Sequence, residues 1–380
     1  MPTHGVARTS WQGTAEVTRE RYIPQVTETL IRGRLLTAML RKKGRFKFNE
    51  AGDQLTWPVE YKQTQPRQLG DGQALVFTRK DHHKQAGIDF RSYYAEDLIT
   101  HINERQNRGT EAMVKLIGTK LESLKRSMTD FWNSQLYVDG NAAGNEQKLH
   151  GFGSFDGEST TVAADKIAKP GDTYAGVSTA VGAAGGSWSS DLTTSPNASI
   201  ATDWPFGGGA NGQLDSQYDY WSPKLWNWSS NNWGTSGQTW QDNCLAVLRT
   251  AIEVQSRLCG SEGRPDLFLT ESQMCIDLKN KLESRLRINS PHKESMDLGF
   301  ASTINYDGLG VDVDYGCPVN SGYGLSLNNL AIHSQHDELF KSWGPEWHTD
   351  RLAYIFLCIF LGNARYTSPK FFFKTKNYAS

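Results

Sequence analysis

A polar hairpin that runs directly into a very long helix, between Gly52 and Gly140, constrains this chain more than any other feature. The two hairpin arms read LTWPVEYKQ, at Leu55–Gln63, and GIDFRSYY, at Gly87–Tyr94. The helix is predicted over about Asn103–Val138, a length of about 54 Å. A two-stranded ribbon is marginally stable alone, and its open edges invite pairing with another chain. A compact monomer cannot bury both elements, so we expect a subunit that completes its fold against copies of itself.

Charge and composition argue against several classes of protein. The 380 residues carry a formal net charge of −1, whereas a domain that binds duplex nucleic acid directly is usually basic. The most apolar stretch, Leu352–Leu361, is much shorter than the roughly 20 residues of a membrane helix. The N-terminal MPTHGVARTSWQG contains no apolar run, so we expect no secretory signal. The five cysteines include no CxxC pair, which indicates a reduced setting without a disulfide framework or a zinc site.

The long helix has a one-sided pattern. Its apolar residues recur at steps of three and four and form a single stripe: Met113, Ile117, Leu121, Leu124, Met128 and Phe131. Charged residues on the opposite side are predicted to face solvent or a partner: Lys115, Lys120, Glu122, Lys125 and Arg126. Before the hairpin, residues 1–15 are expected to form a flexible arm, and the apolar spacing over Glu20–Leu40 predicts a first helix.

A segment rich in glycine, serine, threonine and asparagine, residues 141–239, also concentrates tryptophan. Such a composition cannot form a conventional core, yet large aromatic rings are rarely left in water. We therefore predict ordered loops held by packed tryptophans, within or between subunits, and favour this over an exposed platform for sugars or bases. The tryptophans are Trp188, Trp204, Trp221, Trp226, Trp228, Trp233 and Trp240.

From Trp240 onward the pattern is typical of an α+β protein. Helices are predicted at Gln241–Leu258 and from Thr270 to about Arg285, the second opened by a capping-box signature at Thr270 and Gln273. Strands are predicted at Arg264–Thr270, Ile304–Val313, Gly324–His333 and Arg351–Leu361, and over PKFFFKTKNY at 369–378.

Several motifs in order resemble one family, the major capsid proteins of tailed bacteriophages with the Hong Kong 97 type fold. FRSYYAEDLITHINERQNRGTEAMVKLIGTKL, with Glu104, Asn107 and Gly109, resembles the junction into their spine helix. LYVDGN followed by LHGFGSF resembles the helix exit, and YDYWSPKLWNW resembles the tryptophan-bearing segment before the axial domain. PDLFLTESQMCIDLKNKL, GFASTINYDGLGVDVDYGCP and YGLSLNNLAIHSQHDELF resemble the axial domain itself. The resemblance runs from about residue 16 to the end, and residues 157–217 are longer and richer in glycine and serine than the family pattern.

The resemblance implies an α+β fold of the Hong Kong 97 type, with an N-terminal arm, an extended E-loop hairpin, a long spine helix, and peripheral and axial domains. The implied ranges are 1–50 for the N-terminal arm and helix, 51–98 for the E-loop hairpin, 99–239 for the peripheral domain with the spine helix and the tryptophan-rich loops, 240–350 for the axial domain and 351–380 for C-terminal strands that return to the peripheral sheet.

The resemblance also implies a function, which is self-assembly through hexamers and pentamers into an icosahedral shell around packaged double-stranded DNA. Such a protein is found in the virion, is assembled in the host cytoplasm, meets a portal, and encloses double-stranded DNA without sequence-specific binding. Only about 50 residues precede the hairpin, so we expect a separate scaffolding protein. No membrane partner, enzymatic activity, cofactor or metal is expected. The residues expected at contacts between subunits are Trp57, Val59, Gln68, Leu69, Asp71, Val76, Phe77, Arg79, Lys80 and Lys84 of the hairpin, and Glu104, Asn107, Gly109, Lys115 and Arg126 of the spine helix.

Other interpretations remain open. The tryptophan loops suit a carbohydrate-binding protein, and an encapsulin, a cellular shell protein, shares the fold. In HSQHDE, the strand assignment directs His333 and His336 to opposite faces, which favours a polar loop over a metal cluster. His83 and its neighbour His82 are assigned to a solvated, partner-facing loop rather than to catalysis or pH sensing. Some capsids of this fold link an E-loop lysine to an asparagine of a neighbour. Lys80 or Lys84 could be the donor here, although the sequence identifies no acceptor.

Overall fold

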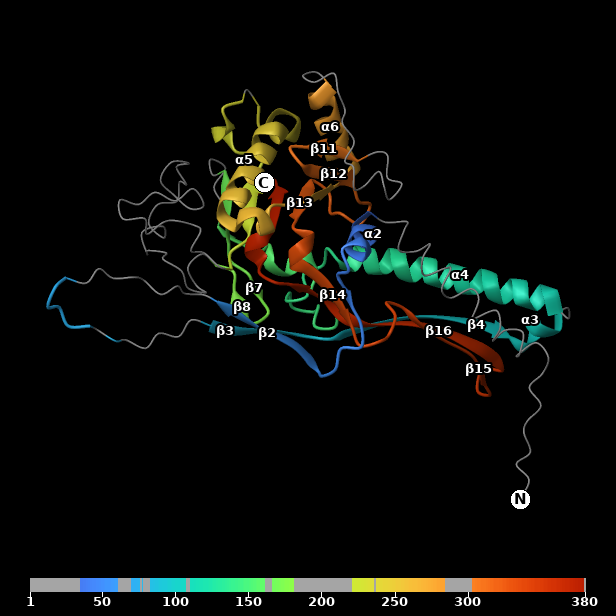
Figure 1. Ribbon diagram of the computed structural model, residues 1–380. Helices are drawn as coiled ribbons and strands as arrows, with labels where there is room; N and C mark the ends of the chain where they lie inside the picture. Colours follow the sequence, from blue (N-terminus) through green and yellow to red (C-terminus); the bar gives the residue numbers. More distant parts are fainter. Residues whose placement is uncertain are drawn as a thin grey trace.

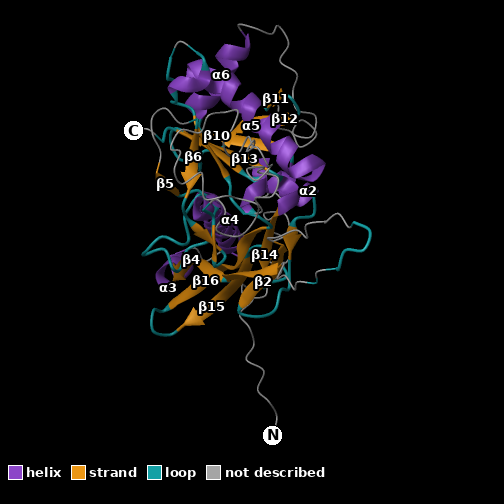
Figure 2. Cartoon of the chain, turned by 90° about the vertical axis from the view of Figure 1, so that its left-hand side faces the viewer, coloured by secondary structure: helices purple, strands orange, loops and turns teal. Residues whose placement is uncertain are grey.

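The computed structural model describes residues 35–60, 70–75, 77, 83–106, 110–160, 166–180, 221–235, 237–283 and 303–378. Two sheets organise this part of the chain. An elongated five-stranded sheet forms the base, and an eight-stranded sheet with two helices rises from one end of it (Figure 1). The view along the molecule in Figure 2 shows the same two levels. The predicted α+β class is confirmed.

The elongated sheet is built around its longest strand, β16 (Ala353–Tyr366). β4 (Arg91–Thr100) pairs antiparallel with β16 along the whole of its own length. On the other side of β16 lie β15 (Lys341–His348) and β14 (Leu330–Ser334), both antiparallel to it. The short strand β1 (Phe46–Lys47) adds to β14 in parallel. Apolar residues are nearly continuous along β16. The strand β15 was not among those predicted from the sequence.

The long helix covers one face of this sheet. α3 (His101–Gln106) is followed by α4 (Thr110–Gln135), whose 26 residues span about 39 Å. The helix thus begins two residues before the predicted start, and residues 107–109 lie outside the described part of the chain. The buried side chains of α4 that form its apolar stripe are Ile117, Leu121, Leu124, Met128 and Trp132.

The predicted stripe is confirmed at Ile117, Leu121, Leu124 and Met128, whereas the side chain of Met113 lies outside the described part. It differs at its end and on its charged side. Phe131 is half exposed, and the neighbouring Trp132 takes the buried position, with its ring 6.1 Å from Phe340 and 6.0 Å from Phe360. Lys125, predicted to face solvent or a partner, is 1% exposed and lies near Cys358 of β16. Helical spacing identifies the stripe, but it does not define the width of the buried face.

The eight-stranded sheet draws its strands from distant parts of the sequence. In spatial order they are β11 (Ile304–Tyr306), β12 (Leu309–Val313), β10 (Leu267–Thr270), β13 (Ser321–Leu325), β17 (Phe373–Lys376), β9 (Lys224–Asn227), β6 (Ile167–Pro170) and β5 (Glu158–Thr160). α5 (Trp240–Gly263) and α6 (Ser272–Glu283) pack with this sheet around Phe268. α5 begins at Trp240 because the Thr239 side chain accepts a hydrogen bond from the Asp242 N–H.

The predicted strand Gly324–His333 is two strands in different sheets. β13 belongs to the eight-stranded sheet and β14 to the elongated sheet, because the 3-10 turn Leu327–Asn329 redirects the chain between them. The predicted strand Ile304–Val313 is likewise a hairpin, β11–β12, which turns at Asp307 and Gly308, both with positive φ. Further 3-10 helices are Phe152–Phe155, Asn231–Trp233 and Pro369–Phe371.

A separate two-stranded ribbon consists of β2 (Gln54–Glu60) and β3 (His83–Asp89). The predicted arm Gly87–Tyr94 is therefore divided at Phe90, since its second half starts β4 of the elongated sheet. A small hairpin, β7 (Thr173–Tyr174) and β8 (Val177–Ser178), lies beside the ribbon. Upstream, α2 (Leu35–Lys42) is the described part of the predicted first helix. None of the described helices combines the length and the apolar character that a membrane span requires.

Strand pairing crosses the implied domain ranges. β1, from range 1–50, pairs with β14, from range 240–350. The two C-terminal strands also separate, β16 into the elongated sheet and β17 into the eight-stranded sheet. The division into five ranges remains a prediction, and the sheets themselves are composite.

Candidate assembly surfaces

The base of the ribbon is packed against its own chain. Trp57 and Val59 alternate with exposed residues along β2 and are both buried. The Trp57 indole N–H donates to the Thr367 carbonyl at 3.1 Å, and the Arg365 guanidinium lies 5.6 Å from the ring centre. Both residues were expected at a contact between subunits. In the single chain they are already covered, because the apolar face of β2 docks on the end of β16.

Two further contacts fix the root of the ribbon. The Gly87 N–H donates to the Ala175 carbonyl at 3.1 Å, which joins β3 to the turn of the β7–β8 hairpin. In the connection that leads into β2, Glu50 Oε1 lies 2.9 Å from His333 Nδ1. The Glu50 N–H also donates to the Ser334 carbonyl. The ribbon therefore leaves the body from a fixed base.

The far end of the ribbon is a tight turn that stands away from the body (Figure 1). The Gln73 N–H donates to the Gly70 carbonyl at 3.2 Å, and Gly72 has a φ of 78°, as the third residue of a type II turn requires. Beyond the turn, Leu75 is 64% exposed and Phe77 is 89% exposed. These two large apolar side chains form an exposed surface at the end of the projecting ribbon, which we call the tip.

The other predicted contact residues of the hairpin divide into two groups. Asp71 and Lys84 are exposed, Asp71 in the turn at the tip and Lys84 on β3. Gln68, Leu69, Val76, Arg79 and Lys80 lie outside the described residues. Their role at contacts between subunits remains a prediction.

The spine helix is tied to the sheet by charge as well as by apolar contact. The Lys120 ammonium lies 2.9 Å from Asp97 Oδ1 and 3.0 Å from the Leu98 carbonyl, so it bridges α4 and β4. Burial lowers the pKa of Lys125, and the nearby Cys358 and Glu338 oppose that shift.

The spine residues predicted at contacts lie in different settings. Glu104 Oε2 lies 3.2 Å from His101 Nδ1, so Glu104 has a polar partner within α3. Arg126 is exposed on α4. Lys115 belongs to α4, whereas Asn107 and Gly109 fall outside the described residues.

The described tryptophans of the glycine-rich segment are packed inside the chain. Trp221, Trp226, Trp233 and Trp240 are buried, and Trp228 is half-buried. Three of the four buried indole N–H groups donate to backbone carbonyls: Trp221 Nε1 to Val177, Trp233 Nε1 to Asn227 and Trp240 Nε1 to Met274. The buried rings are therefore packed within the chain and do not form an exposed stacking platform. Trp188 and Trp204 lie outside the described part.

The groups that resemble reactive sites are structural in the described residues. His333 bonds to Glu50, while His336 contacts the ring of Trp343 edge-on, at 6.4 Å. No cluster of metal-ligating side chains is present in the described ranges. Burial raises the pKa of Cys244 and of Cys358 to about 11, so both remain thiols at neutral pH. His83 is exposed on β3, and His82 is not described.

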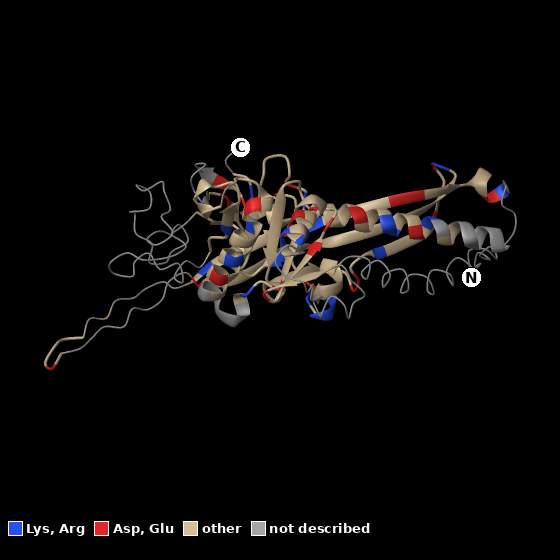
Figure 3. Cartoon of the chain, turned by 90° about the horizontal axis from the view of Figure 1, so that it is seen from above, with Lys and Arg blue, Asp and Glu red and all other residues tan. Residues whose placement is uncertain are grey.

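Charge is mixed over the part of the molecule that is described. Figure 3 shows Lys and Arg interspersed with Asp and Glu along α4 and the strands, without a single-sign stripe in that view. This distribution agrees with the formal net charge of −1.

We compared the chain with known proteins and with solved structures. No protein-family model and no curated protein matches the sequence. Among solved structures, the chain is similar to one in the Cyanophage A-1(L) capsid asymmetric unit, with a TM-score of 0.51, 15% identity, and coverage of 90% of this chain and 93% of that chain. It is also similar to a chain in the capsid of the native GTA particle, with a TM-score of 0.54, 9% identity and 89% coverage of both chains.

The agreement extends over nearly the whole of all three chains, and at these levels of identity it establishes the fold. The chain has the capsid fold of these structures, the Hong Kong 97 type fold that the sequence motifs predicted.

Proposed function

We propose that this protein is a major capsid protein, which self-assembles into the icosahedral shell around the packaged double-stranded DNA of a tailed phage. The observation that carries the proposal is the tip, where Leu75 and Phe77 stand exposed at the end of a ribbon whose base is fixed to the body. A free monomer gains no stability from an exposed apolar end on a projecting segment. In an assembly, the tip of one copy can be buried against a neighbouring copy.

One such contact contributes a modest free energy of association, but the contributions add up when the contact is repeated throughout a shell. Burying a side chain of the size of Phe77 stabilises by about 1.5–3 kcal/mol. Heterologous contacts of this kind close into rings when the rotation permits, and each added copy then binds through several contacts at once. Hexamers and pentamers that join into a shell are the expected products.

The proposed partners follow from the same role. A separate scaffolding protein and a portal would define shell size and the entry point for DNA. DNA would be enclosed without sequence-specific binding, which suits the mixed charge in Figure 3. The location would be the virion, after assembly in the host cytoplasm, and the role is structural rather than enzymatic.

The direct test is negative-stain electron microscopy of the purified protein, expressed alone and with candidate scaffolding proteins. The proposal predicts closed shells, or rings of five and six copies. Nuclease-protected DNA in shells made during phage growth supports the phage role, whereas enclosed enzymes would indicate the encapsulin alternative. A monodisperse monomer under every condition overturns the proposal.

A further inference from the structure

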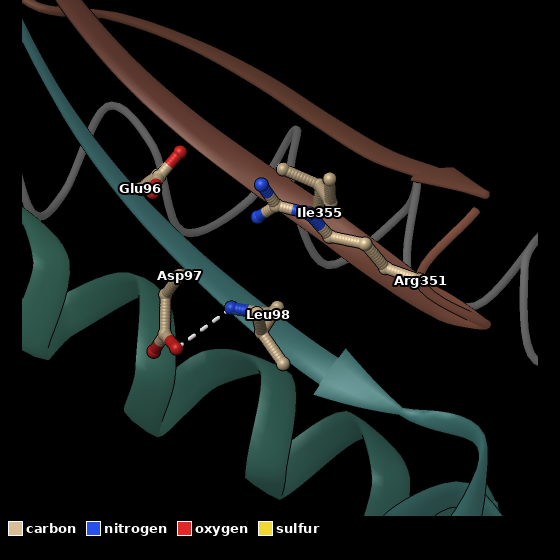
Figure 4. Close-up of a pocket in the computed structure, with 5 residues that line it drawn as sticks. All are labelled: Glu96, Asp97, Leu98, Arg351 and Ile355. Atoms are coloured by element: carbon tan, nitrogen blue, oxygen red, sulfur yellow. Dashed lines mark hydrogen bonds between the residues drawn. The ribbon is translucent and has the colours of Figure 1, made fainter. Parts of the chain in front are cut away.

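The end of the elongated sheet that lies farthest from the ribbon carries a small hollow with opposite charges at its edge. The hollow measures about 120 Å³ and is lined by Glu96, Asp97, Leu98, Arg351 and Ile355. Figure 4 shows the Arg351 guanidinium on the same side of β4 as Glu96 and directed toward it. This face of the sheet is turned away from α4.

The two carboxylates of the hollow have different surroundings. Asp97 points to the α4 side, where it binds Lys120 at 2.9 Å and accepts a hydrogen bond from the Leu98 N–H at 2.7 Å. Glu96, the preceding residue, points to the opposite face because side chains alternate along a strand. Glu96 and Arg351 are both exposed, and neither forms an ion pair with a described residue.

Apolar side chains surround this pair of charges on the same face and at the same end. Strand register places Trp343 opposite Leu357, and Leu357 opposite Glu96, in one row across the sheet. The next row places Tyr94, which is 71% exposed, opposite Ile359. At the turn before β16, Leu352 is 59% exposed. A charged pair set among exposed apolar groups is typical of a surface that is covered by a partner.

We propose that this surface is a contact between copies of the chain, in which Glu96 of one copy pairs with Arg351 of the partner subunit. The inference rests on the proposed function, and it identifies a second contact at the end of the molecule opposite the tip. A surface that carries both a carboxylate and a guanidinium is complementary to itself. A second copy is therefore the partner that matches it without any further charged group. The surrounding apolar side chains exclude water and strengthen the pair.

Charge reversal distinguishes a pair between copies from a pair within one chain. Glu96→Arg and Arg351→Glu each place like charges together, so each variant alone should lose shell yield by about tenfold or more, since 1.4 kcal/mol corresponds to a factor of ten. When the two variants are mixed in equal amounts, each contact between unlike copies again brings one arginine against one glutamate. The mixture should recover shells that contain both chains, as measured by electron microscopy and by a different affinity tag on each variant. Glu253→Arg, an exposed reversal on α5, serves as the charge-matched control.

Each outcome decides a different claim. If neither reversal lowers the shell yield, the inference is wrong while the proposed function stands. If a chain that carries both Glu96→Arg and Arg351→Glu assembles but the mixture of the single variants does not, the pair acts within one chain and the inference is also wrong. If the unaltered protein never assembles, the proposed function fails and the inference fails with it. Thermal unfolding of each unassembled variant must match that of the unaltered protein, and because both residues are exposed we expect it to do so.

Discussion

The indole N–H of Trp57 donates a hydrogen bond to the carbonyl of Thr367, 310 positions later in the chain, at 3.1 Å. This bond joins the start of the projecting ribbon to the end of β16. Trp57, which the sequence assigned to a contact with a neighbour, anchors the ribbon within the single chain. Its role at a contact between subunits remains a prediction. The projecting surface begins beyond this residue.

Trp57→Ala should therefore destabilise the unassembled protein by about 3–5 kcal/mol, as expected when a buried tryptophan is replaced by alanine. The free energy of unfolding in urea measures the effect. Phe77→Ala is the matched control, because an exposed aromatic ring contributes little to the fold and should change the free energy by less than about 0.5 kcal/mol. Equal effects of the two substitutions would contradict this assignment of anchor and tip.

The tip should show the reverse behaviour in assembly. Leu75→Ser combined with Phe77→Ser removes the apolar end of the ribbon without touching the packed base. We expect normal thermal unfolding of the monomer and a loss of shells in electron micrographs. Ile276→Ser on α6, where a comparable side chain is 48% exposed, is the control and should assemble normally. Full assembly of the tip variant would show that Leu75 and Phe77 are not contact residues.

Asp172, before the β7–β8 hairpin, makes stability depend on pH. Burial raises the pKa of Asp172 to about 6 from an ordinary value of 3.8, and the nearby Asp139 and Asp156 add to the rise. The folded state therefore holds this proton more tightly than the unfolded state. Its contribution is fully present below about pH 4 and is lost as the pH rises through 6.

Asp172→Asn should then stabilise the protein relative to the unaltered chain at pH 7, and the difference should shrink toward pH 4. The expected gain is about 2 kcal/mol, because solvent reaches this half-buried carboxyl and screens part of the cost of its charge. Urea unfolding of both proteins across this range checks the sign. A constant difference between the two proteins at all pH values would contradict it.

Lys125 should make stability depend on pH in the opposite direction from Asp172. Its folded pKa lies below the ordinary value of 10.5 because burial disfavours the charged form. The unfolded state binds the proton more tightly, so this residue lowers stability at neutral pH and the cost fades as the pH rises toward 10.5. Lys125→Met should be neutral or stabilising at pH 7. Unfolding curves of both proteins at pH 7 and pH 10 test this, and a large loss for the variant at pH 7 would contradict it.

A pair of glycine substitutions tests the register of the eight-stranded sheet. Gly324 lies opposite Phe373, and an added Cβ would fall 1.9 Å from its ring, so Gly324→Ala should cost about 3 kcal/mol or more. Gly118→Ala on α4, where no described atom lies within 4 Å of the added Cβ, should instead stabilise by about 0.5–1 kcal/mol. The melting temperatures of the two variants should move in opposite directions.

The sequence predicted most helices and strands, because spacing and capping within a short window determine where they form. Steps of three and four identified α4, and Thr239 and Trp240 define where α5 begins. The strands of the elongated sheet were harder, since β15 mixes Trp343 and Trp347 with charged residues and has no clean alternation. Pairing between positions as distant as Phe46 and Ile332 leaves no trace in a sequence window.

The packing of the predicted contact residues could not be derived from the sequence, for a physical reason. Trp57 and Phe77 are both apolar residues of a polar hairpin, and only the tertiary structure shows that Arg365 and Thr367 cover the first. Glu96 and Arg351 were not singled out at all, because one exposed charge resembles another until strand pairing brings the two together. The register of β4 against β16 was the missing information.

The most direct test of the central claim is a cryo-electron microscopy reconstruction of the particles that this protein forms. The account predicts a closed icosahedral shell in which the ribbon tip of each copy, with Leu75 and Phe77, lies buried against a neighbouring copy. A protein that remains a monomer, or a shell in which the tips stand free in solvent, would contradict it.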